Sequence, residues 1–217
     1  MTTDHSARKP RTVRTSDALI EHGLVDAGER DAIDQVARQF AVAITPSVLE
    51  TITTSDPEHG VARQYVPSAA ENTIAPDELD DPIGDARHAP LRGIIHRYPD
   101  RVLLNAIQTC AVYCRFCFRR EQVGPHNKAL SAQELDDALL YIREHDAIWE
   151  VILSGGDPLM LPANQLARIA QALADIPHVK VMRLHTRVPT AAPKRVTDDM
   201  IAALRIMTPT YVAVHVN

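Results

Sequence analysis

Residues 102–117 read VLLNAIQTCAVYCRFC. The run begins with a short, mostly apolar segment, 102–107, whose length and composition predict a buried strand. Cys110, Cys114 and Cys117 follow in a loop, and they are the only cysteines in the chain. Three thiolates at C-x3-C-x2-C spacing can hold a cubane iron–sulfur cluster by three of its irons, which leaves the fourth iron open. An open iron can bind a substrate, so this stretch predicts a reaction site as well as an electron carrier.

Helices and strands alternate after the cysteine loop. We expect helices over about 132–145, 163–175 and 198–207, and strands over 149–153, 179–184 and 211–216. This alternation is typical of an α/β fold with a parallel sheet and right-handed crossovers. With the strand at 102–107 the chain has only about four strands, which is too few for a closed (β/α)8 barrel. We therefore predict a partial (β/α) barrel.

The sequence divides into three parts. Residues 1–15 are polar and basic and predict a disordered arm. Residues 16–93 begin with helical patterning to about Glu50 and continue as an extended connection rich in Pro, Asp and Glu. Residues 94–217 form the α/β part. Because the chain stops at Asn217, in or just after a predicted strand, we expect the barrel to be truncated there.

The composition argues against several classes of function. The 217 residues are 45% hydrophobic and 24% charged, as in a globular protein with a substantial core. A formal net charge of −5 predicts no nucleic-acid partner. No segment approaches the roughly 20 apolar residues of a membrane span, and the N-terminus lacks the apolar region of a secretory signal. Three clustered cysteines without an export signal indicate the reducing cytoplasm.

Zinc is the main alternative ligand for the cysteine loop. A structural zinc site would need a fourth ligand, and His126 is the nearest downstream histidine. Structural zinc usually uses two C-x2-C pairs, whereas only one such pair occurs here. Three inert buried thiols are a further alternative, but the clustering of all three cysteines within eight residues argues against it.

A second motif ends the strand expected at 149–153. The residues that follow read Ser154-Gly155-Gly156-Asp157-Pro158. Adjacent glycines allow a ligand to approach the backbone closely, and the Asp157 carboxylate can accept hydrogen bonds from an ammonium group. The same residues also suit a turn between strand and helix for geometry alone. Because the motif lies one strand after the cysteines, we interpret it as part of the same site.

Other charged residues lie near the predicted strand ends. Arg119 and Arg120 follow the last cysteine and can either grip carboxylates or form a solvated cationic face. His215 lies at the end of the last strand, where a core histidine is the alternative. Residues 96–101 read HRYPDR and can bind a phosphate, although a Pro-Asp turn with exposed arginines is the simpler interpretation.

Several runs resemble the lysine 2,3-aminomutase family of the radical S-adenosylmethionine (SAM) superfamily. CAVYCRFC looks like the cluster motif of the superfamily, and SGGDPL resembles its element for the methionine ammonium group. The resemblance to the aminomutases covers about residues 40–217. It rests on four runs: GIIHRYPDRVLL, CAVYCRFCFRR, VILSGGDPL and RLHTRVPTAAPKRVT.

The resemblance implies a barrel of the radical SAM type with a [4Fe-4S] cluster, S-adenosyl-L-methionine and pyridoxal 5′-phosphate. In the family, a reduced cluster cleaves SAM to a 5′-deoxyadenosyl radical, which takes a hydrogen from L-lysine held as an imine on pyridoxal phosphate. The amino group then moves from C2 to C3. We also expect a flavodoxin- or ferredoxin-type reductant, and a homo-oligomer is possible.

The resemblance also assigns roles to individual residues. Cys110, Cys114 and Cys117 would ligate the cluster, and Arg119 would grip the substrate carboxylate. The other assigned residues would bind cofactors: Phe116 near the adenine, Ser154, Gly155, Gly156, Asp157 and His215 around SAM, and Arg97, Tyr98 and Arg101 near pyridoxal phosphate.

The chain departs from the family pattern toward its end. The family's pyridoxal-binding lysine and the acidic residues that hold the substrate ammonium lie downstream of the last strand expected here. Lys128, Lys180 and Lys194 occur in other contexts. We therefore expect this chain to bind a cluster and SAM without completing the aminomutation. Two alternatives stay open: an enzyme that makes β-lysine for modification of elongation factor P, and an inactive fragment or non-catalytic metal-binding module.

Overall fold

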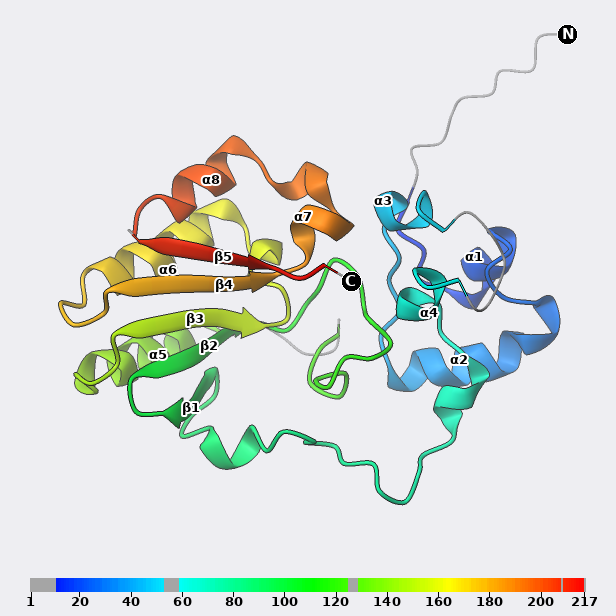
Figure 1. Cartoon of the computed structure of the whole chain (residues 1–217), viewed down its shortest axis with the longest axis horizontal. Coiled ribbons are helices and arrows are strands. Elements are labelled where there is room, and N and C mark those ends of the chain that lie inside the picture. The colour runs from blue at the N-terminus through cyan, green and yellow to red at the C-terminus, as the bar shows by residue number, and fades with distance from the viewer. Residues whose placement is uncertain (1–10, 53–58, 125–128, 208, 217) are drawn as a thin grey trace, which may run out of the picture.

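A computed structural model describes residues 11–52, 59–124, 129–207 and 209–216. Figure 1 shows two parts that face each other, a sheet backed by helices and a smaller region of short N-terminal helices. The loop that carries the cysteines lies between these two parts (Figure 1). His126 and Lys128, both considered above, lie outside the described residues.

The sheet contains five strands in the order β1-β2-β3-β4-β5. Strand β1 pairs antiparallel with β2, and the pairs from β2 to β5 are all parallel, which confirms the predicted α/β fold. The strands span Ile94–Tyr98, Arg101–Ile107, Glu150–Gly155, Val181–Thr186 and Thr210–Val214.

The sheet has one strand more than the roughly four that the sequence predicts, because β1 lacks a clear strand signal. Residues 96–101 were expected to lead into the first strand, but Ile94–Tyr98 is itself a strand, joined to β2 by the Pro99-Asp100 turn. Tyr98 pairs directly with Arg101 across this turn. The segment is short and only its first two residues are buried, so it lacks the long apolar run that marks an inner strand.

Three helices cover one face of the sheet. They are α5 (Ala132–Glu144), α6 (Ala163–Ala174) and α8 (Asp198–Leu204), each close to its predicted range. Ser131 begins α5 with a capping box that uses Glu134, and Thr197 caps α8 by accepting a hydrogen bond from the backbone of Met200. Three shorter turns complete this part: η4 (Pro158–Met160), α7 (Val188–Ala191) and η5 (Pro193–Arg195).

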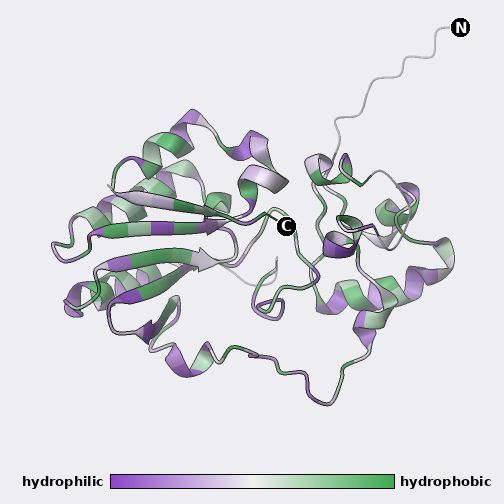
Figure 2. Ribbon diagram, in the orientation of Figure 1, coloured by the Kyte–Doolittle hydropathy of each residue, from purple (hydrophilic) through white to green (hydrophobic). Residues whose placement is uncertain are grey.

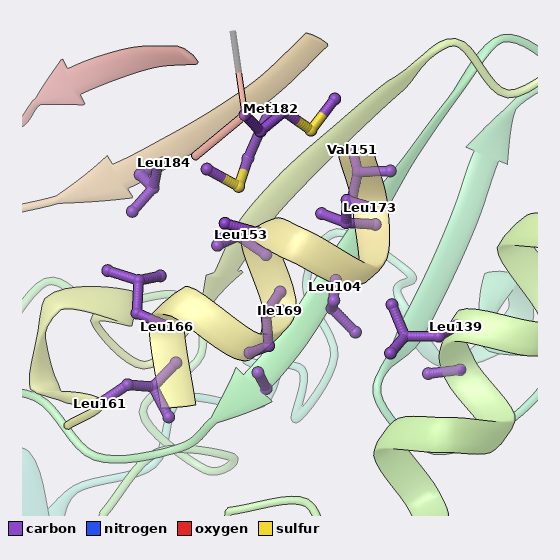
Figure 3. Close-up of a cluster of buried hydrophobic side chains, with 14 of the residues drawn as sticks. Leu104, Leu139, Val151, Leu153, Leu161, Leu166, Ile169, Leu173, Met182 and Leu184 are labelled. Carbon is purple, nitrogen blue, oxygen red and sulfur yellow. The ribbon is translucent and has the colours of Figure 1, made fainter. Parts of the chain in front are cut away.

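The main hydrophobic core lies between this sheet face and the helices. Leu104, Leu153 and Leu184, from three neighbouring strands, are fully buried there. Figure 3 shows them with Leu166, Ile169 and Leu173 of α6 and Leu139 of α5, whose apolar faces point toward the strands. Figure 2 shows hydrophobic and hydrophilic residues interleaved along the helices, as expected for helices with one buried face. No such layer of helices covers the opposite face of the sheet among the residues described (Figure 1).

The N-terminal region is helical, as predicted, but its helices are short. They are α1 (Ser16–Glu21), η1 (Ala27–Glu29), α2 (Arg30–Gln39), α3 (Pro46–Leu49), α4 (Ala62–Tyr65), η2 (Ala69–Asn72) and η3 (Ala86–His88). Gly23, with a φ of 65°, follows the end of α1, because only glycine adopts this left-handed conformation at little cost. Val13 is buried and pairs with Ile44, so the disordered arm expected over 1–15 does not extend to Val13.

Candidate functional site

The cysteine loop leaves the carboxyl end of β2 and is bonded to the turn that follows β3. The backbone N–H of Gly156 donates to the carbonyl oxygen of Ile107 at 2.7 Å, and the N–H of Asp157 donates to that of Thr109 at 3.0 Å. The two motifs singled out from the sequence therefore lie side by side. Parallel strands place their carboxyl ends at one edge of the sheet, where α/β proteins bind their ligands.

The N-terminal region contacts the cysteine loop on the side opposite the sheet. Arg115 is largely buried, and its guanidinium donates to both carboxylate oxygens of Glu71, at 3.0 and 2.5 Å. The same guanidinium donates to the carbonyl oxygen of Ala41 at 2.9 Å, and the backbone N–H of Arg115 donates to that of Gln64 at 2.8 Å. These contacts hold the cysteine loop from the side opposite the sheet.

All three cysteines are free thiols and line a single hollow of about 50 Å³. Phe40 and Arg120 also line this hollow, with the Arg120 guanidinium 4.2 Å from the centre of the Phe40 ring. Burial raises the pKa of the Cys110 thiol, and the charges of the nearby carboxylate and of the other two sulfurs raise it further. Burial also raises the pKa of Cys114, to about 11. The three thiols therefore share one small, largely buried hollow.

The glycines of the second motif are required by close packing. A side chain on Gly156 would place its Cβ 2.5 Å from the carbonyl oxygen of Thr109, within the cysteine loop. Gly155 has a φ of 98°, and a Cβ there would lie 2.8 Å from the carbonyl oxygen of Ile107. Ser154, just before them, is buried at the end of β3. The glycines therefore let the β3 turn approach β2 and the cysteine loop.

Asp157 serves the fold rather than presenting a free acceptor. Its carboxylate is buried, and one oxygen accepts hydrogen bonds from the Leu159 N–H at 3.0 Å and the Thr186 hydroxyl at 2.7 Å. The other oxygen accepts from the N–H groups of Arg187 and Val188, at 2.7 and 3.1 Å. A carboxylate has about four acceptor positions, so these bonds occupy the side chain that was expected to bind an ammonium group. We correct that expectation: the Asp157 carboxylate joins the end of β3 to the end of β4.

Arg187 was missed in the sequence and brings together two of the predicted residues. Its guanidinium is buried and donates to the Tyr65 hydroxyl at 2.8 Å, and its Nη2 lies 3.0 Å from Nδ1 of His215. It also lies 5.5 Å from the centre of the Phe116 ring. Phe116 and His215, both exposed, thus meet around one cation at the carboxyl ends of β4 and β5. The signal was an arginine placed directly after a strand, in RLHTR.

Arg119 and Arg97 meet at a carboxylate that the sequence did not suggest. Nε and Nη2 of Arg119 lie 2.9 and 2.8 Å from the same oxygen of Asp85, and Nη2 of Arg97 lies 3.3 Å from the other oxygen. Asp85 is buried, although it belongs to the segment that was expected to be an extended connection. Its contacts place Arg97 and Arg119 in one cluster.

Arg101 lies at the opposite end of β2 from the cysteine loop. The strand from Arg101 to Ile107 spans about 20 Å, at about 3.3 Å per residue. Both carboxylate oxygens of Asp100 accept hydrogen bonds from Arg101, which hold the pKa of Asp100 down to about 2, and Glu150 lies 3.2 Å from the same guanidinium. Tyr98 is 59% exposed. The guanidinium groups of Arg101 and Arg97 therefore pair with different carboxylates, Arg101 with Asp100 and Glu150 and Arg97 with Asp85, and the pyridoxal contacts stay predictions.

The uncovered face of the sheet carries several charged groups. Glu150 is fully buried and pairs with Arg183 at 2.5 Å as well as with Arg101. His185 follows two residues later on the same face of β4. Burial lowers the pKa of His185, and the nearby guanidinium groups of Arg183 and Arg119 lower it further, against the opposing effect of the Glu150 carboxylate.

The sequence profile of the Radical SAM superfamily matches residues 104–217. The chain belongs to the radical SAM superfamily. The match begins in β2 and includes the cysteine loop, the SGGDP turn, Arg187 and His215. Membership of this superfamily implies a [4Fe-4S] cluster and SAM as cofactors.

Curated relatives narrow the comparison to aminomutases. The chain is 34% identical over 205 residues to an L-lysine 2,3-aminomutase of Clostridium subterminale. This alignment covers 94% of the chain and 49% of the relative. The chain is 35% identical over 189 residues to a glutamate 2,3-aminomutase of Clostridioides difficile, covering 87% of this chain and 44% of that one. The chain spans about half the length of the curated relatives it matches.

The three thiols of the hollow are a donor set that fits an iron–sulfur cluster. Thiolates that share one tetrahedral zinc ion lie about 3.8 Å apart, from zinc–sulfur bonds of about 2.3 Å. Among the residues that the structure describes, no three His, Cys, Asp or Glu side chains are close enough to hold one ion. In a cubane cluster each cysteine binds a different iron, so the sulfurs stand farther apart. Cys110, Cys114 and Cys117 are free thiols in one hollow, as that arrangement needs.

The raised pKa of Cys114 predicts slow alkylation at neutral pH in the metal-free protein. Iodoacetamide reacts with the thiolate, so its rate with Cys114 should reach half its maximum near pH 11, compared with about 8.5 in the unfolded chain. Because the folded pKa is the higher one, this thiol stabilises the fold below about pH 8.5, and its contribution is lost as the pH rises to about 11. Mass spectrometry of modified peptides measures the profile, and a midpoint at or below 8.5 contradicts the described burial.

The helices give no indication of a membrane span. Within the part of the chain that the structure describes, no helix has both the length and the apolar composition needed to cross a bilayer.

Proposed function

We propose that this chain binds the cluster and SAM of a radical aminomutase, and that the enzyme moves an amino group between C2 and C3 of an amino acid. The observation that carries the proposal is the hollow lined by Cys110, Cys114 and Cys117, directly beside the turn at Gly155 and Gly156. When bound, a reduced [4Fe-4S] cluster supplies the electron that breaks a carbon–sulfur bond of SAM. The protein's part is to orient the reactants and to exclude water.

The residues around the hollow support distinct roles in binding SAM. Phe116 offers an exposed ring for the adenine, and both Phe116 and His215 lie beside Arg187. The glycine turn packs directly against the cysteine loop, which places it beside the hollow where we propose that the methionine end of SAM binds. The positive charge of Arg187 favours thiolate at Cys114, since it lowers the pKa of that thiol against the effect of burial.

L-Lysine is the first candidate substrate, because several curated relatives are named L-lysine 2,3-aminomutase. The glutamate 2,3-aminomutase is as similar, so L-glutamate is the second candidate. Both substrates carry an α-carboxylate, for which Arg119 is the proposed partner. We also propose pyridoxal phosphate as the group that holds the substrate amine, with Arg97 and Tyr98 nearby. A small flavodoxin- or ferredoxin-type protein is the proposed source of electrons.

The test is SAM cleavage by the anaerobically reconstituted chain. With dithionite as reductant, we expect 5′-deoxyadenosine and methionine in equal amounts, measured by liquid chromatography and mass spectrometry. Cys117→Ser should reduce the yield at least a hundredfold, because one iron loses its protein ligand. Parallel reactions with L-lysine or L-glutamate, each with and without pyridoxal phosphate, identify the substrate by the increase in rate. Equal 5′-deoxyadenosine from wild type and Cys117→Ser contradicts the proposal.

A further inference from the structure

Asp85 is a buried carboxylate that the proposed chemistry has not yet used. Its side chain is 5% exposed, and it bridges the guanidinium groups of Arg119 and Arg97. These two arginines come from different elements, since Arg97 lies on β1 and Arg119 lies in the cysteine loop. A buried charge of this kind is retained only when it is paired and hydrogen-bonded, as it is here.

The turn that carries Asp85 is itself firmly held. The carboxylate of Asp81 accepts hydrogen bonds from the backbone N–H groups of Asp85 and Ala86, both at 2.8 Å, which lower the pKa of Asp81. Arg97 also donates to the carbonyl oxygen of Ile83 at 2.5 Å. Asp85 is therefore held in place by contacts other than its bond to Arg119. It can orient Arg119 for that reason.

The geometry at Arg119 leaves part of its guanidinium for a ligand. Asp85 contacts only Nε and Nη2, which form one edge of the planar group. The guanidinium lies 4.7 Å from the centre of the Phe118 ring, which restrains its plane. A guanidinium has five N–H donors, so the edge formed by Nη1 and Nη2 can still bind a carboxylate in bidentate fashion. Two arginines and one aspartate together carry one net positive charge, which a single carboxylate would neutralise.

We propose that Asp85 is the positioning residue of the carboxylate site, which fixes the guanidinium of Arg119 so that its free edge faces the substrate. The inference rests on the proposed function, in which Arg119 binds the α-carboxylate of the amino acid. The other possibility is that Asp85 occupies the place of the substrate carboxylate and must leave. The contacts favour positioning, because departure of Asp85 would break its bonds to both arginines.

The experiment measures amino acid binding to the reconstituted chain with SAM present. L-Lysine and L-glutamate labelled with 13C at the carboxylate are titrated by NMR, and L-lysinamide, which lacks the carboxylate, is titrated alongside. For Asp85→Asn we expect about tenfold weaker binding of the two amino acids, since one charge-assisted orienting contact is lost. L-Lysinamide should bind equally to wild type and variant. Asp80→Asn, the same change at an exposed residue of the same segment, should bind as wild type does.

A second variant keeps the inference testable if Asp85→Asn does not fold. Asp85→Glu retains the charge but moves the carboxylate by one methylene, and it should show the same selective loss. Thermal melts by circular dichroism confirm folding of each variant. Unchanged or tighter amino acid binding in a folded Asp85 variant overturns the inference, as does a wild type that binds L-lysinamide as well as L-lysine. Iron content and 5′-deoxyadenosine formation are measured on the same samples, so failure of the proposed function appears separately.

Discussion

Gly156→Ala is expected to prevent cluster assembly and to destabilise the protein by about 3 kcal/mol. The added Cβ would lie 2.5 Å from the carbonyl oxygen and 2.6 Å from the nitrogen of Thr109. Both are backbone atoms, so the clash cannot be relieved by a side-chain rotation. The turn after β3 and the cysteine loop would have to separate, which breaks the bond from Gly156 to Ile107.

Iron content after reconstitution and the midpoint of urea unfolding measure this effect. Gly28→Ala is the matched control, because a Cβ at Gly28 would meet no atom within 4 Å. We expect the control to retain wild-type iron content and to change the free energy of unfolding by less than about 0.5 kcal/mol. A Gly156→Ala protein that binds iron like wild type contradicts the packing described for the cysteine loop.

Asp157→Asn is expected to be the other severe change, with a loss of about 3 kcal/mol or more. Both carboxylate oxygens of Asp157 accept two hydrogen bonds each, from Leu159 and Thr186 and from Arg187 and Val188. An amide replaces one oxygen with a donor that faces other donors, so two bonds are lost and buried groups are left unpaired.

Urea unfolding also measures this second effect, and Asp146→Asn provides the control at an exposed position. The loss in free energy of unfolding should also be the same with and without SAM, because the Asp157 carboxylate is engaged within the fold. If Asp157→Asn instead folds normally and binds SAM more weakly, the Asp157 carboxylate contacts the cofactor, as the family resemblance implies.

Local sequence patterns predicted the parts of the site that depend on spacing. Cys110, Cys114 and Cys117 lie within eight residues, and the glycine turn follows a single apolar strand, so both could be recognised without a structure. The alternation of strands with amphipathic helices likewise predicted the sheet, because periodicity reports burial directly. The match to the Radical SAM superfamily agrees with the predicted α/β fold and with the family resemblance.

The contacts that the sequence did not reveal all join distant segments. Arg187 contacts Tyr65, 122 residues away, and Asp85 contacts Arg119, 34 residues away. The residues that flank an arginine or aspartate in the sequence do not indicate which distant charged residue the fold will place beside it. Strand β1 was missed for a related reason, since its pairing with β2 depends on a turn that was interpreted as a surface loop.

We propose that the three cysteines hold a [4Fe-4S] cluster with one iron open to SAM. The most direct measurement is electron paramagnetic resonance of the anaerobically reconstituted, dithionite-reduced chain, recorded with and without SAM, together with analysis of iron, sulfide and zinc. We predict about four irons and four sulfides per chain and a spectrum that changes when SAM is added. A colourless chain that retains one zinc, or a cluster whose spectrum is the same with SAM, would contradict the claim.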